Sequence, residues 1–159
     1  PPAGDTTIFY HSWYRRLIDD RAKGFDAKRW SRACDEINEF ESQQRDHGTL
    51  IVKLFFHVSA EVQAERLNLR QSDPWRRHLA ENDVPPSRDE RALTTAALHD
   101  MFVATDTRWA PWHVIDANDK QAARIAALTL LADSFAKAIP AEPPANGGTV
   151  LAFPNQKSA

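Results

Sequence analysis

Arginine supplies most of the positive charge of this 159-residue chain, with 14 arginines against 6 lysines. Six of the arginines lie in one segment, residues 66–91, which contains no lysine. Guanidinium groups bind two phosphate oxygens at once in a planar geometry that an ammonium group cannot match. The segment therefore predicts a site for a phosphate-bearing anion. A solvated helical face is the alternative, because acidic residues lie in the same stretch. The arginines are Arg66, Arg70, Arg76, Arg77, Arg88 and Arg91, and the acids are Asp73, Glu81, Asp83, Asp89 and Glu90.

The histidines and the cysteine give weaker evidence of a functional site than the arginines do. The spacing of His57, His78 and His99 from acidic residues does not match a metal site. His11 has two possible roles, either a general base or phosphate contact, or a hydrogen-bonded structural residue at a strand end. Cys34 is the only cysteine, which excludes internal disulfides and cysteine-based zinc sites. We expect Cys34 to be a buried apolar side chain.

Composition indicates an ordinary globular domain. The chain is 42% hydrophobic and 26% charged, with a mean hydropathy of −0.54 and a net charge of −2. This charge balance gives no sign of a nucleic-acid or anionic-membrane partner. The longest apolar run, residues 50–56, is too short to cross a bilayer. We expect a cytoplasmic protein.

The elements that would position these residues alternate between strands and helices. We predict strands at Thr6–Phe9, Thr49–Val58 and Trp112–Asp116. Helices are predicted at Asp26–His47, with Asp26 as N-cap and Gly48 after its end, at Ser59–Arg70, and at Arg88–Ala104. On the first of these helices, Trp30, Cys34, Ile37 and Phe40 share one face.

The last predicted helix begins at Asn118, with Gln121 as its capping-box partner. An apolar stripe with spacings of three and four predicts its core-facing side. The stripe consists of Ile125, Leu128, Ala132, Phe135 and Ile139. Residues 72–87 carry Asp-Pro and Pro-Pro pairs and predict an excursion from the core, while the composition of residues 140–159 predicts a flexible linker or tail.

Strands that alternate with helices predict an α/β fold with a parallel sheet and right-handed crossovers. Three strands make a thin sheet, and the first begins almost at residue 1. We therefore expect the chain to be the back half of a larger α/β domain that is incomplete at the N-terminus.

Several short motifs then occur in the order found in one enzyme family. Three of them are Ser12-Trp13-Tyr14, Ala104-Thr105-Asp106-Thr107 and Ala110-Pro111-Trp112. From about Thr6 to Ile139 the chain resembles the type 2 polyphosphate kinases. The further matches are Gly24-Phe25, Ser59 with Gln63 and Arg66, Asp73-Pro74 with Arg76 and Arg77, and Asp116-Ala117 with Asp119-Lys120.

The resemblance implies a P-loop kinase fold that moves phosphate between inorganic polyphosphate and AMP or ADP with Mg²⁺. It implies a partial kinase domain over residues 1–139, whose lid is the excursion at 72–87. Arginines there would neutralise charge on the phosphates. The candidate phosphate- or nucleotide-binding residues are Arg16, Arg66, Arg70, Arg76, Arg77 and Asp106. For Asp106 two roles stay open, namely orienting a loop near the nucleotide or capping a turn.

Departures from the family pattern concern the phosphate site itself. Active members of the family carry Phe-Asp-Arg before Ser-Trp-Tyr, whereas this chain has Phe9-Tyr10-His11. Neither Tyr10 nor His11 is a normal Mg²⁺ ligand, because this cation prefers anionic oxygen. In the lid, His78-Leu79 follows Arg77 where the family tends to place Trp-Lys. No G-x-x-x-x-G-K-[ST] motif occurs in the chain. We expect neither a catalytic residue nor a metal ligand in this segment, which by itself should not transfer phosphate.

Two interpretations follow. The chain is part of a polyphosphate-dependent nucleotide kinase, or it has a packing, dimerising or polyphosphate-binding role. The second interpretation follows from the resemblance, because some larger polyphosphate:AMP phosphotransferases hold two copies of the domain, one of them degenerate in its phosphate motifs, and this sequence looks more like the degenerate copy. Tyr10 favours the second for this copy, which we expect to form a homo-oligomer or to pack on a sister domain. An ordinary nucleoside monophosphate kinase is a third, weaker option. Trp13, Trp30 and Trp112 could pack in the core or at the sheet edge, or serve as base-stacking platforms, and we expect packing.

Overall fold

The computed structural model describes residue 2, residues 4–80 and residues 86–139. The predicted tail at 140–159 and part of the predicted lid lie outside these residues. Within them the elements run in the order α1 (Tyr14–Ala22), α2 (Ala27–Asp46), β1 (Lys53–His57), α3 (Ala60–Ser72), α4 (Arg77–Ala80), α5 (Arg88–Thr105), β2 (Trp112–Asp116) and α6 (Lys120–Ala138). None of the helices in these ranges has the length and apolar character needed to span a membrane.

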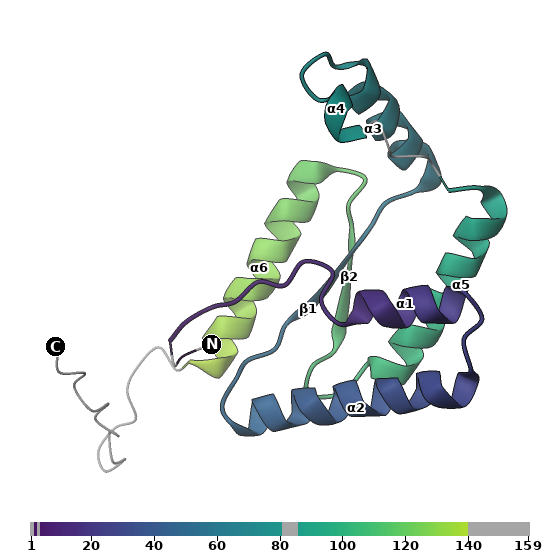
Figure 1. Cartoon of the computed structure of the whole chain (residues 1–159). Coiled ribbons are helices and arrows are strands. Elements are labelled where there is room, and N and C mark those ends of the chain that lie inside the picture. The colour runs from purple at the N-terminus through teal and green to yellow at the C-terminus, as the bar shows by residue number, and fades with distance from the viewer. Residues whose placement is uncertain (1, 3, 81–85, 140–159) are drawn as a thin grey trace, which may run out of the picture.

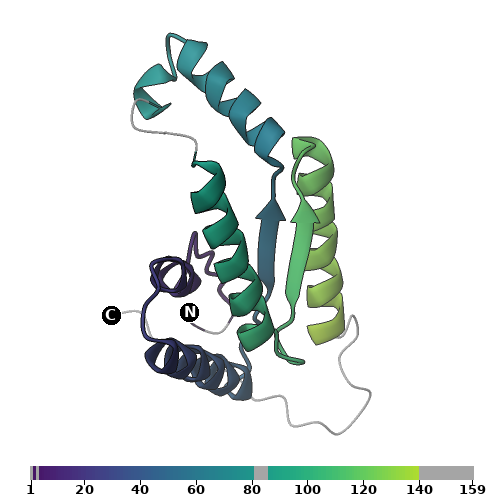
Figure 2. The same ribbon diagram turned by 90° about the vertical axis from the view of Figure 1, so that its right-hand side faces the viewer.

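The two strands form a parallel sheet in which Lys53 pairs with Trp112 and His57 with Asp116. Figure 2 shows α5 on one face of this sheet and α6 on the other. Helices α1 and α2 pack against α5, while α3 and α4 project beyond the carboxyl ends of the strands (Figure 1). We call α3, α4 and the turn between them, residues 60–80, the arm. The predicted α/β class with a parallel sheet is therefore confirmed.

The prediction of a strand at Thr6–Phe9 is wrong. These residues are exposed and form no backbone hydrogen bond with other described residues, and the Ile8 side chain is 90% exposed. An extended segment becomes a strand only when a neighbouring strand pairs with its backbone groups. The described sheet therefore has two strands, and β1 is shorter than the predicted Thr49–Val58.

Caps predicted from the sequence start two helices as expected. The Asp26 carboxylate accepts a hydrogen bond from Lys28 N, and Ser59 Oγ accepts one from Val62 N. The predicted Asn118 cap of α6 is wrong by one residue. Asp119 has the extended backbone of an N-cap, and its carboxylate accepts hydrogen bonds from the backbone N–H groups of Gln121 and Ala122.

Two small apolar cores hold the layers together. The first lies among α1, α2 and α5 and is centred on Tyr14, Leu17, Cys34 and Met101, with Trp13, Trp30 and Trp112 packed against it. The predicted burial of Cys34 and the packing role of these three tryptophans are thereby confirmed. The second core lies between the sheet and α6 and is centred on Ile115, Ala117 and Ala123.

The apolar stripe of α6 does not face either core. Ile125 and Leu128 are each 66% exposed, and Ala132, Phe135 and Ile139 are exposed too. The face turned to the sheet carries Ala123, Ala127 and Leu130 instead. The stripe prediction is wrong within this chain because a helix with apolar residues on two faces can pack only one of them on a two-stranded sheet.

A buried polar cluster joins the sheet to the helices. Lys53 Nζ donates hydrogen bonds to Glu41 Oε2 at 3.1 Å, to Thr105 O at 2.7 Å and to the Tyr14 hydroxyl oxygen at 3.2 Å. The Tyr14 hydroxyl in turn donates to Glu41 Oε1. The side chains of Glu41 and Lys53 are 0% and 4% exposed, so both charges depend on these partners.

Burial shifts the ionisation of this cluster. It raises the pKa of Tyr14 far above its usual value, and the hydrogen bond to the Glu41 carboxylate adds to this shift. Burial also lowers the pKa of Lys53, and the neighbouring Glu41 opposes that shift. Three hydrogen-bond acceptors surround the Lys53 ammonium, and these contacts favour its charged form.

We predict that Leu128→Ala changes the free energy of unfolding by less than about 0.5 kcal/mol, since Leu128 is exposed. Leu130 lies on the same helix but packs on the second core, so Leu130→Ala should lower the free energy of unfolding by about 1–2 kcal/mol. Denaturant unfolding of both variants measures the difference. Equal losses would mean that the stripe is buried in solution.

We predict a pH-dependent stability difference between the wild type and Tyr14→Phe. Below about pH 9 the variant should be less stable by a constant amount, because it lacks the hydrogen bond to Glu41. In the unfolded chain a tyrosine loses its proton near pH 10, at about its ordinary pKa. Folded Tyr14 keeps its proton at that pH, because burial and Glu41 raise its pKa. Wild-type stability should therefore fall above about pH 10 by up to about 1.4 kcal/mol per pH unit relative to the variant.

Denaturant unfolding of wild type and Tyr14→Phe from neutral pH to about pH 11 tests this dependence. A stability gap that stays constant across the whole range would contradict it, because Tyr14 would then ionise as readily in the folded protein as in the unfolded chain.

Candidate functional site

Four of the six predicted site residues lie on the arm. Arg66 and Arg70 are one helical turn apart on α3, so they share a face of that helix. Arg76 is the last residue of the turn between α3 and α4, and Arg77 is the first residue of α4. Arginines that the sequence spreads over twelve positions thus belong to one projecting unit, beyond the carboxyl ends of the parallel strands (Figure 2).

Arg66 joins the arm to the edge of the sheet. Its Nη2 donates hydrogen bonds to Ala117 O and Asn118 O, each at 2.8 Å, directly after the end of β2. Asn118 also contacts the base of the arm, because its Oδ1 accepts a hydrogen bond from Ser59 N at 2.9 Å. Arg66 is therefore a structural tie as well as a candidate phosphate contact.

Asp73 organises the turn between α3 and α4. Its carboxylate accepts a hydrogen bond from Trp75 N at 2.9 Å, and its carbonyl oxygen accepts hydrogen bonds from Arg76 N and Arg77 N at 3.1 and 2.9 Å. The Arg76 guanidinium forms a long ion pair with the same carboxylate, at 3.5 Å, and remains mostly exposed. The turn is thus fixed through its backbone while the Arg76 and Arg77 side chains face solvent.

Arg16 lies away from the arm. It lines a groove of about 580 Å³ between α1 and α2, with Trp13, Phe25 and Phe40 among the apolar lining residues. Its guanidinium pairs with Asp20 on the next turn of α1 at 3.5 Å. The structure does not bring Arg16 into one pocket with the arm arginines.

Asp106 occupies the opposite end of β2 from Arg66. It follows the last residue of α5, and its Oδ1 accepts a hydrogen bond from Trp112 N, the first residue of β2, at 2.8 Å. Of the two roles open to Asp106, this contact is that of a turn cap. In open parallel sheets ligands bind at the carboxyl ends of the strands, whereas Asp106 lies at the amino end.

Tyr10 and His11 precede α1 in an unusual backbone conformation. His11 and Ser12 have φ values of 64° and 41°, in the left-handed region that costs a non-glycine residue about 1–2 kcal/mol. The Tyr10 side chain is 88% exposed, with its ring centroid 4.0 Å from that of His11. Neither residue offers a carboxylate for Mg²⁺, and the described part of the chain holds no group of three or more His, Cys, Asp or Glu residues arranged to bind a metal ion.

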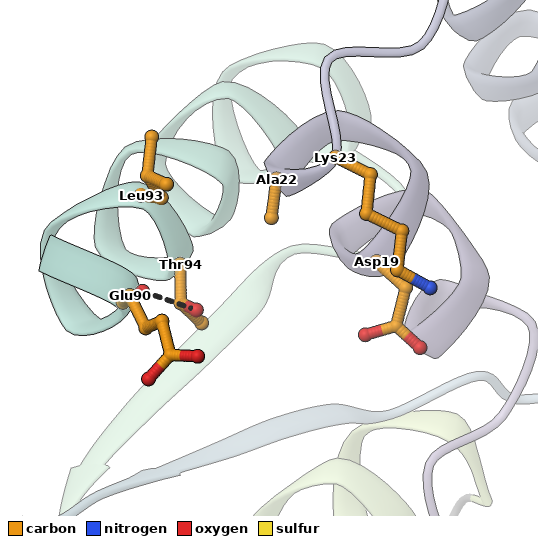
Figure 3. Close-up of a pocket in the computed structure, with 6 residues that line it drawn as sticks. All are labelled: Asp19, Ala22, Lys23, Glu90, Leu93 and Thr94. Atoms are coloured by element: carbon orange, nitrogen blue, oxygen red, sulfur yellow. Dashed lines mark hydrogen bonds between the residues drawn. The ribbon is translucent and has the colours of Figure 1, made fainter. Parts of the chain in front are cut away.

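A small hollow of about 190 Å³ lies between α1 and α5 (Figure 3). Asp19 and Lys23 line it from α1 and the residue that follows α1, and Glu90 and Thr94 line it from α5. Asp19 already pairs with Arg15 at 3.2 Å, and the Thr94 hydroxyl donates to the Glu90 carbonyl oxygen of its own helix. The hollow contains none of the predicted site residues.

Two features of the arm do not follow from the sequence pattern. Arg91 Nη2 on α5 donates to Gln63 Oε1 on α3, which braces the base of the arm. Trp75 is 86% exposed in the turn that Asp73 fixes. The Asp-Pro-Trp-Arg-Arg run at 73–77 was the only available signal for Trp75, and periodicity says nothing of an isolated aromatic residue in a turn.

Comparison with known proteins decides the family. The family model described as "Polyphosphate kinase 2 (PPK2)" matches residues 1–143, most of the chain. The chain belongs to the PPK2 family. The resemblance given by the Ser-Trp-Tyr, Ala-Thr-Asp-Thr and Ala-Pro-Trp motifs is therefore confirmed.

Curated relatives and solved structures agree with the PPK2 assignment. The chain is 35% identical over 136 residues to a polyphosphate:AMP phosphotransferase of Pseudomonas aeruginosa, covering 85% of this chain and 27% of the relative. It is 36% identical over 137 residues to a GDP-polyphosphate phosphotransferase of Mycolicibacterium smegmatis, covering 85% of this chain and 48% of the relative. The crystal structure of Polyphosphate Kinase 2 from Arthrobacter aurescens TC1 matches with a TM-score of 0.69 and 33% identity, over 84% of this chain and 48% of that one.

The matched PPK2 relatives are longer than this chain. The chain spans about a quarter of the length of the polyphosphate:AMP phosphotransferases it matches and about half of the M. smegmatis relative. A putative polyphosphate kinase 2 from P. aeruginosa PA01 gives the same picture, with a TM-score of 0.66 and 32% identity, over 80% of this chain and 28% of that one. The shared unit is thus only part of each relative's chain.

We predict that Arg66→Ala lowers the free energy of unfolding by about 1.5–3 kcal/mol, because it removes two charge-assisted hydrogen bonds to backbone carbonyls. Arg77→Ala is the matched control on the same arm, since the Arg77 side chain is exposed, and it should change stability by less than about 0.5 kcal/mol. Denaturant unfolding measures both. A loss of similar size in the two variants would show that the tie to Ala117 and Asn118 is not stabilising.

Proposed function

We propose that this chain is part of a polyphosphate-dependent nucleotide kinase that transfers phosphate between inorganic polyphosphate and AMP or ADP. Membership of the PPK2 family supports this proposal, as do relatives named as AMP, ADP and GDP phosphotransferases of polyphosphate. The reaction needs groups that hold a densely charged anion and neutralise the charge that develops on the transferred phosphoryl group.

The observation that carries the proposal is the arginine-bearing arm at the carboxyl edge of the sheet. Arg76 and Arg77 extend from a turn whose backbone Asp73 fixes, so their positions relative to Arg66 and Arg70 are partly preset. Guanidinium groups spaced along a helix and a turn suit an extended chain of phosphates, which presents oxygen atoms at regular intervals. In the proposed role the arm binds polyphosphate and screens its charge.

A second candidate role concerns this copy of the domain alone. Tyr10 stands where the resemblance places an aspartate, and neither Tyr10 nor His11 offers Mg²⁺ the anionic oxygen that it prefers. The chain also has no phosphate-binding loop motif. We therefore propose that this segment binds polyphosphate or packs against a sister domain without catalysing transfer itself.

We predict that replacing both Arg76 and Arg77 by Ala weakens binding of a long-chain polyphosphate at least about tenfold at moderate salt, since two charged contacts are lost. Arg32→Ala is a suitable control, because Arg32 is exposed on α2, pairs with Glu36 at 2.9 Å and lies outside the arm. Calorimetric titration measures both affinities. Unchanged affinity in the double variant would overturn the role of the arm.

We predict that the 159-residue chain alone, given polyphosphate, ADP and Mg²⁺, forms no ATP above background. Tyr10→Asp should remain inactive as well, since it restores a carboxylate but not a phosphate-binding loop. A coupled luminescence assay tests both proteins. Sustained turnover by the wild-type chain would overturn the degenerate-copy role and favour a catalytic one.

A further inference from the structure

Trp75 differs from the other tryptophans of the chain in its surroundings. Trp13, Trp30 and Trp112 pack on the first core, and Trp109 lies under the Arg45 guanidinium at 4.9 Å. Trp75 is 86% exposed and makes no aromatic or cation–π contact with any described residue. Both faces of its indole ring are therefore available to a ligand.

The backbone that carries Trp75 is held in place. Asp73 Oδ1 accepts the hydrogen bond from Trp75 N, and the two residues that follow bond to the carbonyl oxygen of Asp73. A side chain presented from an ordered turn loses less conformational entropy on binding than one on an unstructured segment. Asp73 thus presents an unpacked aromatic ring from a fixed position.

The residues around Trp75 limit the class of ligand. Arg76 and Arg77 follow it directly, and Arg70 and the exposed Leu69 lie on the preceding helix. Polyphosphate has no apolar surface, so binding it requires the arginines and gains nothing from an indole ring. A nucleotide carries both a planar base and phosphates, and bases stack on exposed aromatic side chains beside cationic groups.

We propose that Trp75 stacks on the base of the adenine nucleotide while Arg76 and Arg77 bind its phosphates. This inference rests on the proposed function, which supplies AMP or ADP as the nucleotide. In this role Trp75 is a specificity residue of the arm, and it separates nucleotide binding from polyphosphate binding, for which the arginines suffice.

The experiment compares the wild type with Trp75→Leu and with Trp75→Phe, which keeps an aromatic face. Each protein is titrated calorimetrically with ADP and, separately, with tripolyphosphate. We expect ADP to bind about tenfold more weakly to Trp75→Leu and within about threefold of wild type to Trp75→Phe, given the contribution of one stacked base. Tripolyphosphate should bind equally to all three proteins. ADP should also quench the tryptophan fluorescence of the wild type more than that of Trp75→Leu.

The two probes distinguish the possible failures. Equal ADP affinity in the wild type and Trp75→Leu would overturn the stacking role and leave the proposed function standing. A parallel loss of tripolyphosphate affinity in Trp75→Leu would also overturn it, because the substitution would then act on the whole arm. If tripolyphosphate binds but ADP binds to none of the proteins, the inference fails while polyphosphate binding stands. If neither probe binds to the wild type, the proposed function fails with it.

Discussion

The buried pair formed by Lys53 and Glu41 is the constraint on which the rest of this structure depends. Two charges removed from water are tolerated only when each has close partners, and here Tyr14 and Thr105 provide them. The four residues come from α1, α2, β1 and the end of α5, so satisfying the charges fixes these elements relative to one another. The Lys53 ammonium also lies 5.3 Å from the centroid of the Trp112 ring at the start of β2, which adds the second strand to the cluster.

The position of this cluster leaves the other end of the sheet open. Lys53 and Trp112 begin their strands, and Asp106 closes the turn before β2 at the same end. The strands then run to His57 and Asp116, where Arg66 and Asn118 connect the sheet to the arm. The polar cluster at one end of the sheet therefore holds the helices in place, and the other end carries the arginine-bearing arm.

Much apolar surface stays uncovered around this framework. The outward stripe of α6, the extended residues Ile8 and Phe9, and Val114 on β2 are all exposed in the described structure. The solved PPK2 kinase from A. aurescens shares the fold over only 48% of its own chain. A fold unit that buries so little of its apolar surface gains less from the hydrophobic effect than its composition allows, which makes the buried polar cluster and the Arg66 tie more important to it.

The sequence by itself determined most of the local elements and the family. The spacing of apolar residues and the capping residues predicted four helices and two strands to within a few residues of their observed bounds. These signals are local, because a cap such as Ser59 bonds to backbone groups of its own helix. Motif order identified the family, and the concentration of arginine at residues 66–91 drew attention to a segment that the structure places partly on the arm. Tertiary structure alone decided which apolar face of α6 is buried, whether Thr6–Phe9 pairs as a strand, and which candidate residues meet. These outcomes depend on partners distant in the chain. Arg66 donates hydrogen bonds to the carbonyl oxygens of Ala117 and Asn118, and Lys53 donates one to Glu41. Arg16 pairs with Asp20 on its own helix, away from the arm.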